Sequence, residues 1–484
     1  MALCVLCATA CGCASWPATS DATSAAPLPA AELPSAWAAA DAPGAGARAV
    51  DATSLAAWWQ RFDDPLLTDL IGRALMANTS VAAARAALRQ AEALRDVAAA
   101  ALRPTLNASA SAQRGTAGGE STGSRFQAGL EAQWAPDVFG ARRGRLDAAD
   151  AVAASSAASL GDTQVQVAAE VALNYIVLRS AQARWLIARD NLASQRETLQ
   201  ITDWRQQAGL VNSLALEQAR AAAAQTEALL PALETSIGQT AHALAVLLGR
   251  PPAALQAELA AAPATRPLPD AMPESRADPA LGIPAATLRQ RADVRAAEHQ
   301  VAAALARVGQ AQAQRWPSFV IGGSIGLSAV GAAALTHGAS VLSSVLASVS
   351  WPLFDGGAAR AQVRVQQAAL AQAQQVYRAA VLGALEDVEN TLVALNNDRL
   401  RLASLRVAAD AAANAALLAR QRYGSGLVDF QTVLETQRNQ LATQDGVVSA
   451  RADVGRDQVR LFTALGGGWE SAAAVADARR GTTR

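Results

Sequence analysis

The chain has 484 residues, and its 41 basic and 41 acidic side chains leave no net charge at pH 7. This balance excludes most nucleic-acid-binding proteins, because they need a clustered positive surface to neutralise phosphates. The length allows a sizeable core without covalent cross-links. Apolar residues make up 51% of the chain and aromatic residues only 4%, while lysine is absent and alanine is the commonest residue. Such a composition is typical of long packed helices.

All four cysteines lie within the first 13 residues, so the rest of the chain has none for a disulfide or a metal cage. Residues 2–10 are apolar and small, like the central part of a secretory signal peptide, although no positive charge precedes them. A start codon assigned too far downstream would explain that departure. The small residues before Cys11 and before Cys13 each resemble a lipobox, so we expect one of these cysteines to carry diacylglycerol and palmitate. An ordinary cleaved signal and a cytosolic start are the alternatives.

Residues 14–54 are rich in alanine, proline and serine without periodicity, which predicts an extended arm. Beyond residue 13 no run of 18 apolar residues occurs, so the sequence predicts no transmembrane helix. From about residue 55 the chain repeats itself. Residues 81–104 recur as residues 294–317 at an offset of 213, whereas several tryptophans and glycines recur at an offset of 217. These are Trp134, Gly140, Gly209 and Gly249 in the first half and Trp351, Gly357, Gly426 and Gly466 in the second.

The two halves define the domain organisation that we expect. Each half combines a helix, a strand hairpin, a very long helix and a further helix. A linker rich in proline and alanine, 251–284, joins the repeats, and a flexible tail, 469–484, follows them. The first repeat covers 55–250, with its hairpin at about 105–134, its long helix at about 142–207 and its last helix at about 212–249. The second covers 285–468, with the same elements at about 318–351, 358–423 and 428–465.

Apolar and polar residues alternate along each predicted strand, as in a sheet with two different faces. A half-buried sheet of a soluble protein would show the same alternation. Three features favour strands that cross a bilayer: their length, their single apolar face, and the equivalent positions of Trp134 and Trp351 at strand ends, where interfacial aromatic residues belong. Four strands cannot close a barrel, and open edges are forbidden in hydrocarbon. Three copies of the chain would supply twelve strands.

The two long helical stretches contain no proline, and at 1.5 Å per residue each would be about 100 Å long. Apolar residues recur every seven positions along both, which is typical of coiled coils. A cytoplasmic coiled coil would show the same heptads, but a secreted chain with lipid-facing hairpins fits that class poorly. The heptad positions are Val171, Leu178, Trp185, Leu192 and Leu199 in the first stretch and Val388, Leu395, Leu402, Ala409 and Ala416 in the second.

Three segments carry a resemblance to a known family: Trp58–Leu66 (WWQRFDDPL), Trp351–Gly357 (WPLFDGG) and Tyr423–Phe430 (YGSGLVDF). With the tandem repeat, they resemble the outer membrane efflux protein family of TolC-like channels, and best its lipoprotein branch of OprM and NodT-like factors. The resemblance implies a mainly α fold with a transmembrane β-barrel portion. In that fold a homotrimer forms a twelve-stranded outer-membrane barrel, which continues into a coiled-coil helical tunnel. It also implies two partners, a periplasmic adaptor and an inner-membrane pump of the RND type.

A duct that stayed open would leak, so we expect a closure at its periplasmic end. The sharp turns at 208–211 and 424–427 interrupt the helical pattern at equivalent places and would form this end. In the resembling family the segment after the second turn carries an acidic ring and polar locks. This resemblance assigns Glu435 to the ring, Tyr423 and Arg438 to the locks, and Gln431 and Asp429 to the same gate. The alternative is that Glu435 and Arg438 merely pair on a helix surface.

These features predict a passive channel that conducts small molecules, such as drugs, from the pump to the exterior. We expect it in the outer membrane, anchored by an acylated N-terminus and extending into the periplasm. We expect no enzymatic activity, because the histidines His242, His299 and His337 lie outside any nucleophile or metal motif and no phosphate-binding loop occurs. Nor do we expect a metal, another cofactor or nucleic acid. A type I protein-secretion channel and a periplasmic coiled-coil protein without a pore are the alternatives.

Overall fold

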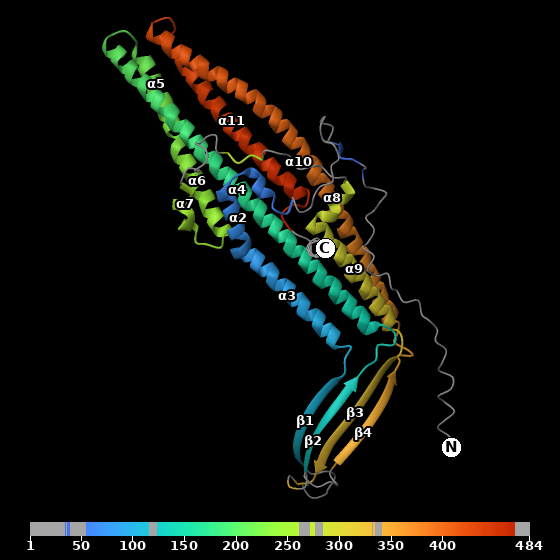
Figure 1. Cartoon of the computed structure of the whole chain (residues 1–484). Coiled ribbons are helices and arrows are strands. Elements are labelled where there is room, and N and C mark those ends of the chain that lie inside the picture. The colour runs from blue at the N-terminus through green and yellow to red at the C-terminus, as the bar shows by residue number, and fades with distance from the viewer. Residues whose placement is uncertain are drawn as a thin grey trace, which may run out of the picture. The chain divides into compact units, whose positions relative to one another are not determined.

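The computed structural model describes residues 34, 36–38, 55–115, 123–260, 272–275, 284–331, 333 and 341–469. Cys11 and Cys13, the candidate acylation sites, lie outside these residues, as does most of the expected arm. The described chain is mainly helical and has one four-stranded sheet (Figure 1). Helix–hairpin–long helix–helix occurs twice in chain order, as the tandem repeat predicts.

The elements of the two repeats correspond one to one around each hairpin. The first repeat contains η2 (Trp58–Phe62), α2 (Pro65–Ala77), α3 (Thr79–Ala100), β1 (Thr105–Gly115), β2 (Gly123–Trp134), α4 (Ala141–Gln207), α5 (Ser213–Glu227) and α6 (Leu229–Leu247). Two short helices follow, η3 (Pro252–Leu255) and α7 (Gln256–Ala260). The second repeat contains α8 (Pro284–Gln290), α9 (Ala292–Ala313), β3 (Ser318–Ala329), β4 (Val341–Ser350), α10 (Ala358–Gly424) and α11 (Phe430–Ala464).

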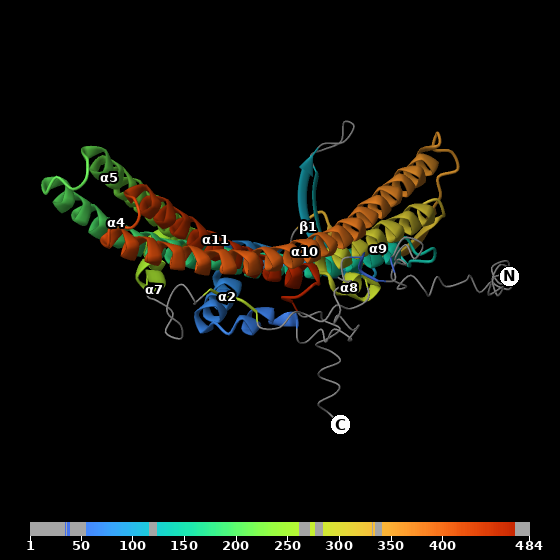
Figure 2. The same cartoon turned by 90° about the horizontal axis from the view of Figure 1, so that it is seen from above.

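The long helices α4 and α10 each have 67 residues and begin and end within one residue of the bounds that the sequence predicts. Figure 2 shows α10 as one continuous helix with α11 beside it, and α5 beside α4. Neither helix contains proline, so no backbone donor is missing from its hydrogen-bond ladder. The heptad positions also behave as predicted, because Val171, Leu178, Val388 and Leu395 are all buried.

The helix expected at about 212–249 is instead two helices. α5 ends at Glu227 and α6 begins at Leu229, with Ala228 between them. Pro231 is the third residue of α6 and has no N–H group to donate to the carbonyl of Glu227. This missing bond explains why the first repeat breaks where the second repeat keeps one helix of 35 residues, α11.

The chain forms two compact units that do not coincide with the two repeats. In the described residues, one unit comprises 91–155 and 297–377 and contains the whole sheet. The other comprises 33–90, 156–296 and 378–484. Each unit therefore takes segments from both repeats, and α4 and α10 contribute to both units. The physical reason is that β2 of the first repeat pairs with β3 of the second, so neither repeat can fold as a separate domain.

The core of the larger unit lies between the middle parts of α4 and α10, α2, and the ends of α6 and α11. Trp58 is fully buried and its ring stacks on that of Phe462, with the ring centroids 5.6 Å apart. Phe62 packs edge-on against both rings. The Trp58 motif that carries the family resemblance is thus a packing element. Its indole joins the start of the first repeat to the end of α11.

Three stretches that the sequence predicts to be loose are packed where the structure describes them. In the linker, Leu255 and Leu259 are buried in the core of the larger unit. In the arm, Trp37 is buried in the same core. Trp469, the first residue of the expected tail, donates from Nε1 to the carbonyl of Gln290 over 3.0 Å. Low sequence complexity hid these anchors because each of them is an isolated large side chain in a stretch without apolar periodicity.

One helix among the described residues, α10, is long and apolar enough to cross a membrane by length and composition alone. Alanine raises its mean hydropathy without producing the continuous apolar run that the sequence criterion required. One such helix is a weak indication of a span, since length and composition alone meet this criterion.

The sheet has four antiparallel strands in the order β1-β2-β3-β4. Its register places apolar residues opposite one another on one face, for example Ala108 with Leu130 and Leu130 with Ile325. Polar residues pair on the other face, such as Glu131 with Ser324. Because side chains alternate along each strand, this agreement across all three pairings makes one face apolar over the sheet. Leu342 and Leu346 are exceptions on the polar face, opposite Gly326 and Gly322.

Candidate functional site

The sheet has one apolar face and one polar face, and both are open to solvent in a single chain. On the apolar face Ile325 is 56% exposed and Val345 is 87% exposed. On the polar face the hydroxyls of Ser324 and Ser344 are hydrogen-bonded at 2.8 Å. A soluble protein covers so large an apolar surface, whereas a bilayer-spanning sheet exposes it to lipid. The arrangement therefore fits a wall with lipid on one side and water on the other.

The two predicted interface tryptophans lie at equivalent strand ends. Trp134 is the last residue of β2, and Trp351 follows the last residue of β4. Both rings are partly exposed, by 40% and 53%. The indole N–H of Trp134 donates to the carbonyl of Leu102 over 3.1 Å, so its polar end is satisfied while its ring stays accessible. An amphipathic ring of this kind suits the boundary between lipid and water.

The sheet is open at both sides. Within the described residues, β1 pairs only with β2 and β4 pairs only with β3. Each outer strand therefore presents a row of backbone donors and acceptors without a strand partner. In hydrocarbon every unpaired group of this kind costs several kcal/mol, so a single chain cannot be the finished wall.

The two predicted turns end equivalent helices in the same way. Gly209 and Gly426 have φ angles of 71° and 72°, which favour glycine because a Cβ atom is strained there. In both turns the next amide bonds back into the helix: that of Leu210 donates to the carbonyl of Arg205, and that of Leu427 to the carbonyl of Arg422. This is the glycine-terminated helix end that reverses a chain sharply.

A small apolar cluster holds these two turns together. Its members come from α5, from the end of α10 and from the start of α11, and Tyr423 and Phe430 form its aromatic part with their ring centroids 5.6 Å apart. Tyr423, a predicted lock residue, is 8% exposed. Its hydroxyl is buried and has no hydrogen-bond partner among the described residues. The structure therefore places Tyr423 inside the chain, under the turn.

Arg205 covers Tyr423 and was not among the residues that the sequence indicated. Its guanidinium lies 4.4 Å from the centre of the Tyr423 ring. The same group donates to the carbonyl of Tyr423 over 3.2 Å and to that of Gly424 over 3.1 Å. These carbonyls lie at the end of α10, where the helix dipole favours a cation, and that of Tyr423 also accepts from the amide of Gly426. Arg205 thus clamps the end of α4 to the end of α10.

Asp429, another predicted gate residue, is the N-cap of α11. Its carboxylate accepts hydrogen bonds from the amide and the hydroxyl of Thr432, over 2.9 and 2.6 Å. The side-chain and backbone hydrogen bonds from Thr432 lower the pKa of Asp429. Asn212 caps α5 in the same way by accepting from the amide of Ala215. Asp429 therefore fixes where the helix after the turn begins.

The other predicted gate residues, Glu435, Gln431 and Arg438, are exposed side chains on the first turns of α11. Among the described residues, no ion pair joins Glu435 to Arg438. The pattern that suggested a paired helix surface is thus not realised within one chain. The carboxylate of Glu435 is free to face whatever lies outside this chain.

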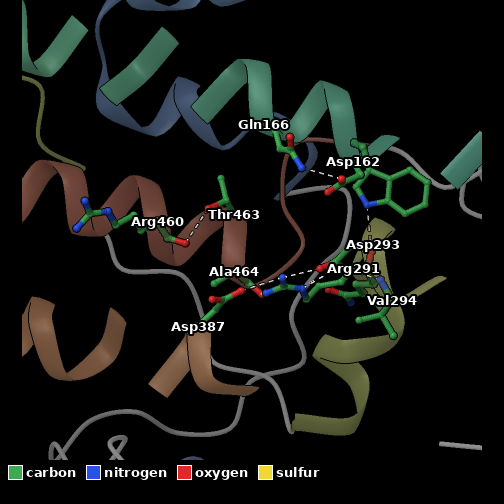
Figure 3. Close-up of polar contacts among 11 residues, drawn as sticks. Asp162, Gln166, Arg291, Asp293, Val294, Asp387, Arg460, Thr463 and Ala464 are labelled. Atoms are coloured by element: carbon green, nitrogen blue, oxygen red, sulfur yellow. Dashed lines mark hydrogen bonds and ion pairs between the residues drawn. The ribbon is translucent and has the colours of Figure 1, made fainter. Parts of the chain in front are cut away.

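A second polar region, in the same unit, surrounds Arg291 between α8 and α9 (Figure 3). Arg291 donates to Asp293 over 2.7 Å and to Asp387 over 3.0 Å, and also to the carbonyl of Ala464 over 3.2 Å. These groups line a cavity of about 370 Å³, together with Asp162 of α4. Burial, followed by the negative charge of Asp293, raises the pKa of Asp162.

This region has a neutral counterpart in the first repeat. There Asn78 donates to the carbonyl of Leu247 over 2.8 Å, at positions equivalent to Arg291 and Ala464. The second repeat thus has an arginine and two carboxylates where the first repeat has an uncharged contact between helix ends. Burial opposes ionisation of Asp293, but the hydrogen bond and charge of Arg291 outweigh it and lower the pKa of Asp293. We interpret the network as structural, because the guanidinium of Arg291 forms ion pairs with both Asp293 and Asp387.

Between α10 and α11, the buried carboxyl group of Asp457 faces a second carboxyl group, that of Asp398. Asp457 is 3% exposed. Burial first, and then the proximity of the Asp398 carboxylate, raise the pKa of Asp457 to about 6. Arg460 lies 3.3 Å from Asp457 and opposes this shift only in part. Near neutral pH Asp457 therefore changes between its neutral and its charged form.

Replacing Asp457 with asparagine is expected to stabilise the protein at pH 8 but not at pH 5. The pKa of Asp457 is higher in the folded chain than in the unfolded chain, so its stabilising contribution is present at low pH and is lost as the pH rises through about 6. Asparagine is uncharged at every pH and therefore places no second negative charge beside Asp398. Melting temperatures at both pH values test this, with Asp410→Asn, an exposed residue of α10, as the control. Equal effects of the two substitutions at pH 8 would contradict the expectation.

Among the described residues, no group of three or more His, Cys, Asp or Glu side chains is placed to hold a metal ion. Each unit has candidate functional features of its own. The smaller unit has the two-faced sheet with open edges, and the larger unit has the pair of turns clamped by Arg205 and the exposed carboxylate of Glu435.

Known proteins share this architecture over most of the chain. The model of the family described as outer membrane efflux protein matches residues 70–250 and 283–467. The chain is 31% identical over 431 residues to nodulation protein T of Rhizobium leguminosarum bv. viciae, covering 89% of this chain and 88% of that protein. It is 32% identical over 435 residues to the pyoverdine export outer membrane protein OpmQ of Pseudomonas aeruginosa, covering 87% and 89%.

The fold is shared as well. The outer-membrane channel OprN superposes with a TM-score of 0.80 and 34% sequence identity, over 88% of this chain and 98% of that one. This similarity confirms the predicted fold class, a mainly α chain with a β portion and two tandem repeats. The matched segments include both hairpins and both long helices, so the assignment rests on the whole architecture and not on single motifs. The chain is a member of the outer membrane efflux protein family, in the branch of the NodT-like proteins.

Proposed function

We propose that the protein is the outer-membrane duct of an efflux system and that three copies close its barrel. The observation that carries this proposal is the sheet: it exposes a continuous apolar face and ends in unpaired strands on both sides. Both features are unstable for a single chain and both are resolved when copies complete one another's wall in a membrane. Three copies provide twelve strands, enough for a lumen lined by the polar face.

The helices supply the part of the duct below the membrane. Each long helix would be about 100 Å in length, much longer than a bilayer is thick, and its buried heptad positions leave other faces open for neighbouring copies. Such a tunnel conducts passively, so a periplasmic adaptor and an inner-membrane pump of the RND type would supply substrate and energy. Acylation at Cys11 or Cys13 would anchor the N-terminus in the outer membrane.

Small molecules are the proposed cargo. Two relatives are named for such cargo: OpmQ for pyoverdine export, and TtgF of Pseudomonas putida for toluene efflux, which is 29% identical to this chain over 421 residues. A passive duct of this kind has no reaction to catalyse, so we propose no enzymatic activity. The wall itself exerts little selection, and the pump chooses the solute.

Planar-bilayer recordings of the purified protein test the proposal. We expect a trimer that is stable in detergent until heated and that produces discrete conductance steps. Monomeric protein that is soluble without detergent would overturn both the channel and its assembly, and would favour a coiled-coil scaffold. Deleting the gene separates the two transport functions: increased sensitivity to dyes and antibiotics supports small-molecule efflux, whereas the loss of a secreted polypeptide supports protein secretion.

Replacing Glu435 with glutamine is expected to reduce the preference of the channel for cations. Three exposed carboxylates around one axis would concentrate negative potential at the mouth of the tunnel. In a salt gradient, the reversal potential of the variant should therefore move toward zero without loss of the trimer. Arg438→Gln is the control, because it removes a charge of opposite sign one helical turn away. An unchanged reversal potential in Glu435→Gln would place this carboxylate on the outside of the tunnel.

A further inference from the structure

The apolar face of the sheet continues beyond the strands as a group of aromatic rings. Phe319 of β3 lies on that face, and its ring stacks on that of Phe139 with the ring centroids 6.3 Å apart. Phe139 also stacks on Trp316, the second residue before β3, at 5.6 Å. Trp134 and Trp351 end the same face at β2 and after β4. Aromatic residues of both repeats therefore border this end of the apolar face.

Exposed arginines lie at every connection between a strand and a helix at this end of the sheet. Arg103 lies between α3 and β1, and Arg143 lies in the first turn of α4. In the second repeat, Arg315 lies between α9 and β3, and Arg360 lies in the first turn of α10. All four residues are exposed, and none of them forms an ion pair within the described part of the chain.

The carboxylates of the same connections do not neutralise these arginines. Residues 101–104, 135–145, 314–317 and 351–360 contain six arginines and only two acidic residues, Asp137 and Asp355. Asp137 accepts hydrogen bonds from two backbone amides at the start of α4, over 3.0 and 2.6 Å. Asp355 accepts from two amides at the start of α10, over 2.8 and 2.7 Å. A chain without net charge thus has an excess of four positive charges at this end of its sheet.

Two hydrogen bonds place part of this charge beside the apolar face. The indole N–H of Trp134 donates to the carbonyl of Leu102, the residue before Arg103. The guanidinium of Arg142 donates to the carbonyl of Ala101 over 2.6 Å. The end of α3 is thus held against Trp134, a ring of the apolar face, so Arg103 lies next to that face.

The apolar face itself is uncharged between its two ends. In the described strands its one charged residue is Arg114, which lies opposite Ser124 at the far end of the pairing of β1 with β2. Basic residues therefore flank the apolar band and do not interrupt it. Tryptophan and arginine just outside an apolar band are typical of the level of the lipid headgroups, where the ring and the charge both reach polar partners.

We propose that these arginines and aromatic rings form a docking surface for anionic phospholipids at the end of the sheet where the long helices begin. The chain contains no lysine, so each basic position offers a planar guanidinium, which donates two parallel hydrogen bonds to a phosphate. A zwitterionic lipid also has a phosphate, but its own ammonium group cancels the charge. The inference rests on the membrane wall proposed above and adds the class of lipid that this wall binds.

Lipid titration of the purified full-length trimer, followed by native mass spectrometry, tests the docking surface. The two probes are phosphatidylglycerol, which is anionic, and phosphatidylcholine, which is zwitterionic, with the same acyl chains. Because one arginine near an anionic lipid surface changes affinity by a factor of about five, we expect the protein to bind phosphatidylglycerol at least about fivefold more tightly. Raising the salt concentration from 50 to 500 mM should reduce this preference.

A triple substitution assigns the preference to this surface. The test variant combines Arg103→Gln, Arg315→Gln and Arg360→Gln. We expect it to remain a trimer with unchanged conductance, because the apolar face is intact, and to bind the two lipids about equally. The matched control removes the same charge from three exposed arginines of the larger unit, none of which forms an ion pair within the described residues. Its substitutions are Arg89→Gln, Arg250→Gln and Arg406→Gln.

Three results would overturn the inference while leaving the proposed channel in place. The first is a conducting trimer that binds both lipids equally well. The second is an equal loss of preference in the test and control variants, which would assign it to total charge. The third is an altered reversal potential in the test variant with its lipid preference intact, which would place these arginines in the lumen. A water-soluble monomer would instead remove the proposed channel, and this inference with it.

Discussion

Replacing Arg205 with alanine is expected to make the channel leak. In planar bilayers the variant should spend more time in states of high conductance, and cells that carry it should admit antibiotics too large for the normal barrier. Arg205 holds the end of α4 to the end of α10 through two carbonyl groups and the ring of Tyr423. These contacts of a half-buried arginine are together worth about 2 kcal/mol per chain, and three chains would lose them at once.

The reason for a leak rather than a collapse lies in the position of the clamp. Arg205 is at the end of its helix, and the apolar cluster beneath it, with Phe430 and Val433, stays in place when the guanidinium is removed. The turns can then separate while the helices remain folded.

Arg422→Ala is the matched control for this variant. Arg422 lies beside Tyr423 in the last turn of α10, has the same charge as Arg205, and is exposed. We expect its replacement to leave the conductance unchanged. If both variants leak equally, positive charge at this end of the molecule matters and the specific clamp does not. If neither leaks although both form trimers, Arg205 has only a structural role.

Replacing Gly249 with alanine is expected to destabilise the protein by about 3 kcal/mol. Gly249 follows the last residues of α6 and has a φ of 66°, a backbone conformation in which a Cβ atom is strained. A Cβ atom added there would lie 2.5 Å from the carbonyl oxygen of Ala77 at the end of α2, and a backbone atom cannot rotate out of the way. The neighbouring hydrogen bond from Asn78 to the carbonyl of Leu247 would be displaced with it.

Gly238→Ala provides the comparison within the same helix. Gly238 lies inside α6, and a Cβ atom added there would have no other side chain or distant backbone atom within 4 Å. Alanine at this position should therefore be neutral or stabilise the helix by up to about 1 kcal/mol. Thermal unfolding of both variants in detergent measures the difference. Melting temperatures that fall by the same amount would mean that the contact with Ala77 carries no constraint.

Local periodicity was enough to predict most of the fold. The alternation around Leu130 and Ile325 and the heptads through Val171 and Val388 are local patterns, and each determines an element and its buried or exposed face. The repeat offsets predicted which elements correspond, and the registers of the two hairpins confirm that correspondence. Among the gate residues, the sequence could name Tyr423 and Glu435 only through family resemblance.

Other features could not be found in this way because their partners are distant in the chain. Arg205 and Tyr423 are 218 residues apart, and nothing near Arg205 distinguishes it from the other arginines of α4. The raised pKa of Asp457 depends on burial between two helices and on the carboxylate of Asp398, which is 59 residues away in the chain. The anchors Trp37 and Trp469 lie in stretches of low complexity, and their partners too are distant in the chain.

The sequence by itself determined the period of every long element, the duplication, and the need for a lipid-facing wall, because these follow from the spacing of apolar residues along one strand or helix. Only the tertiary structure decided that the repeats interlock through β2 and β3, that Arg205 clamps the turn, and that Asp457 faces another carboxylate. Those outcomes depend on distances between separate segments, and such distances are set by how buried surfaces and charges are satisfied together across the whole chain.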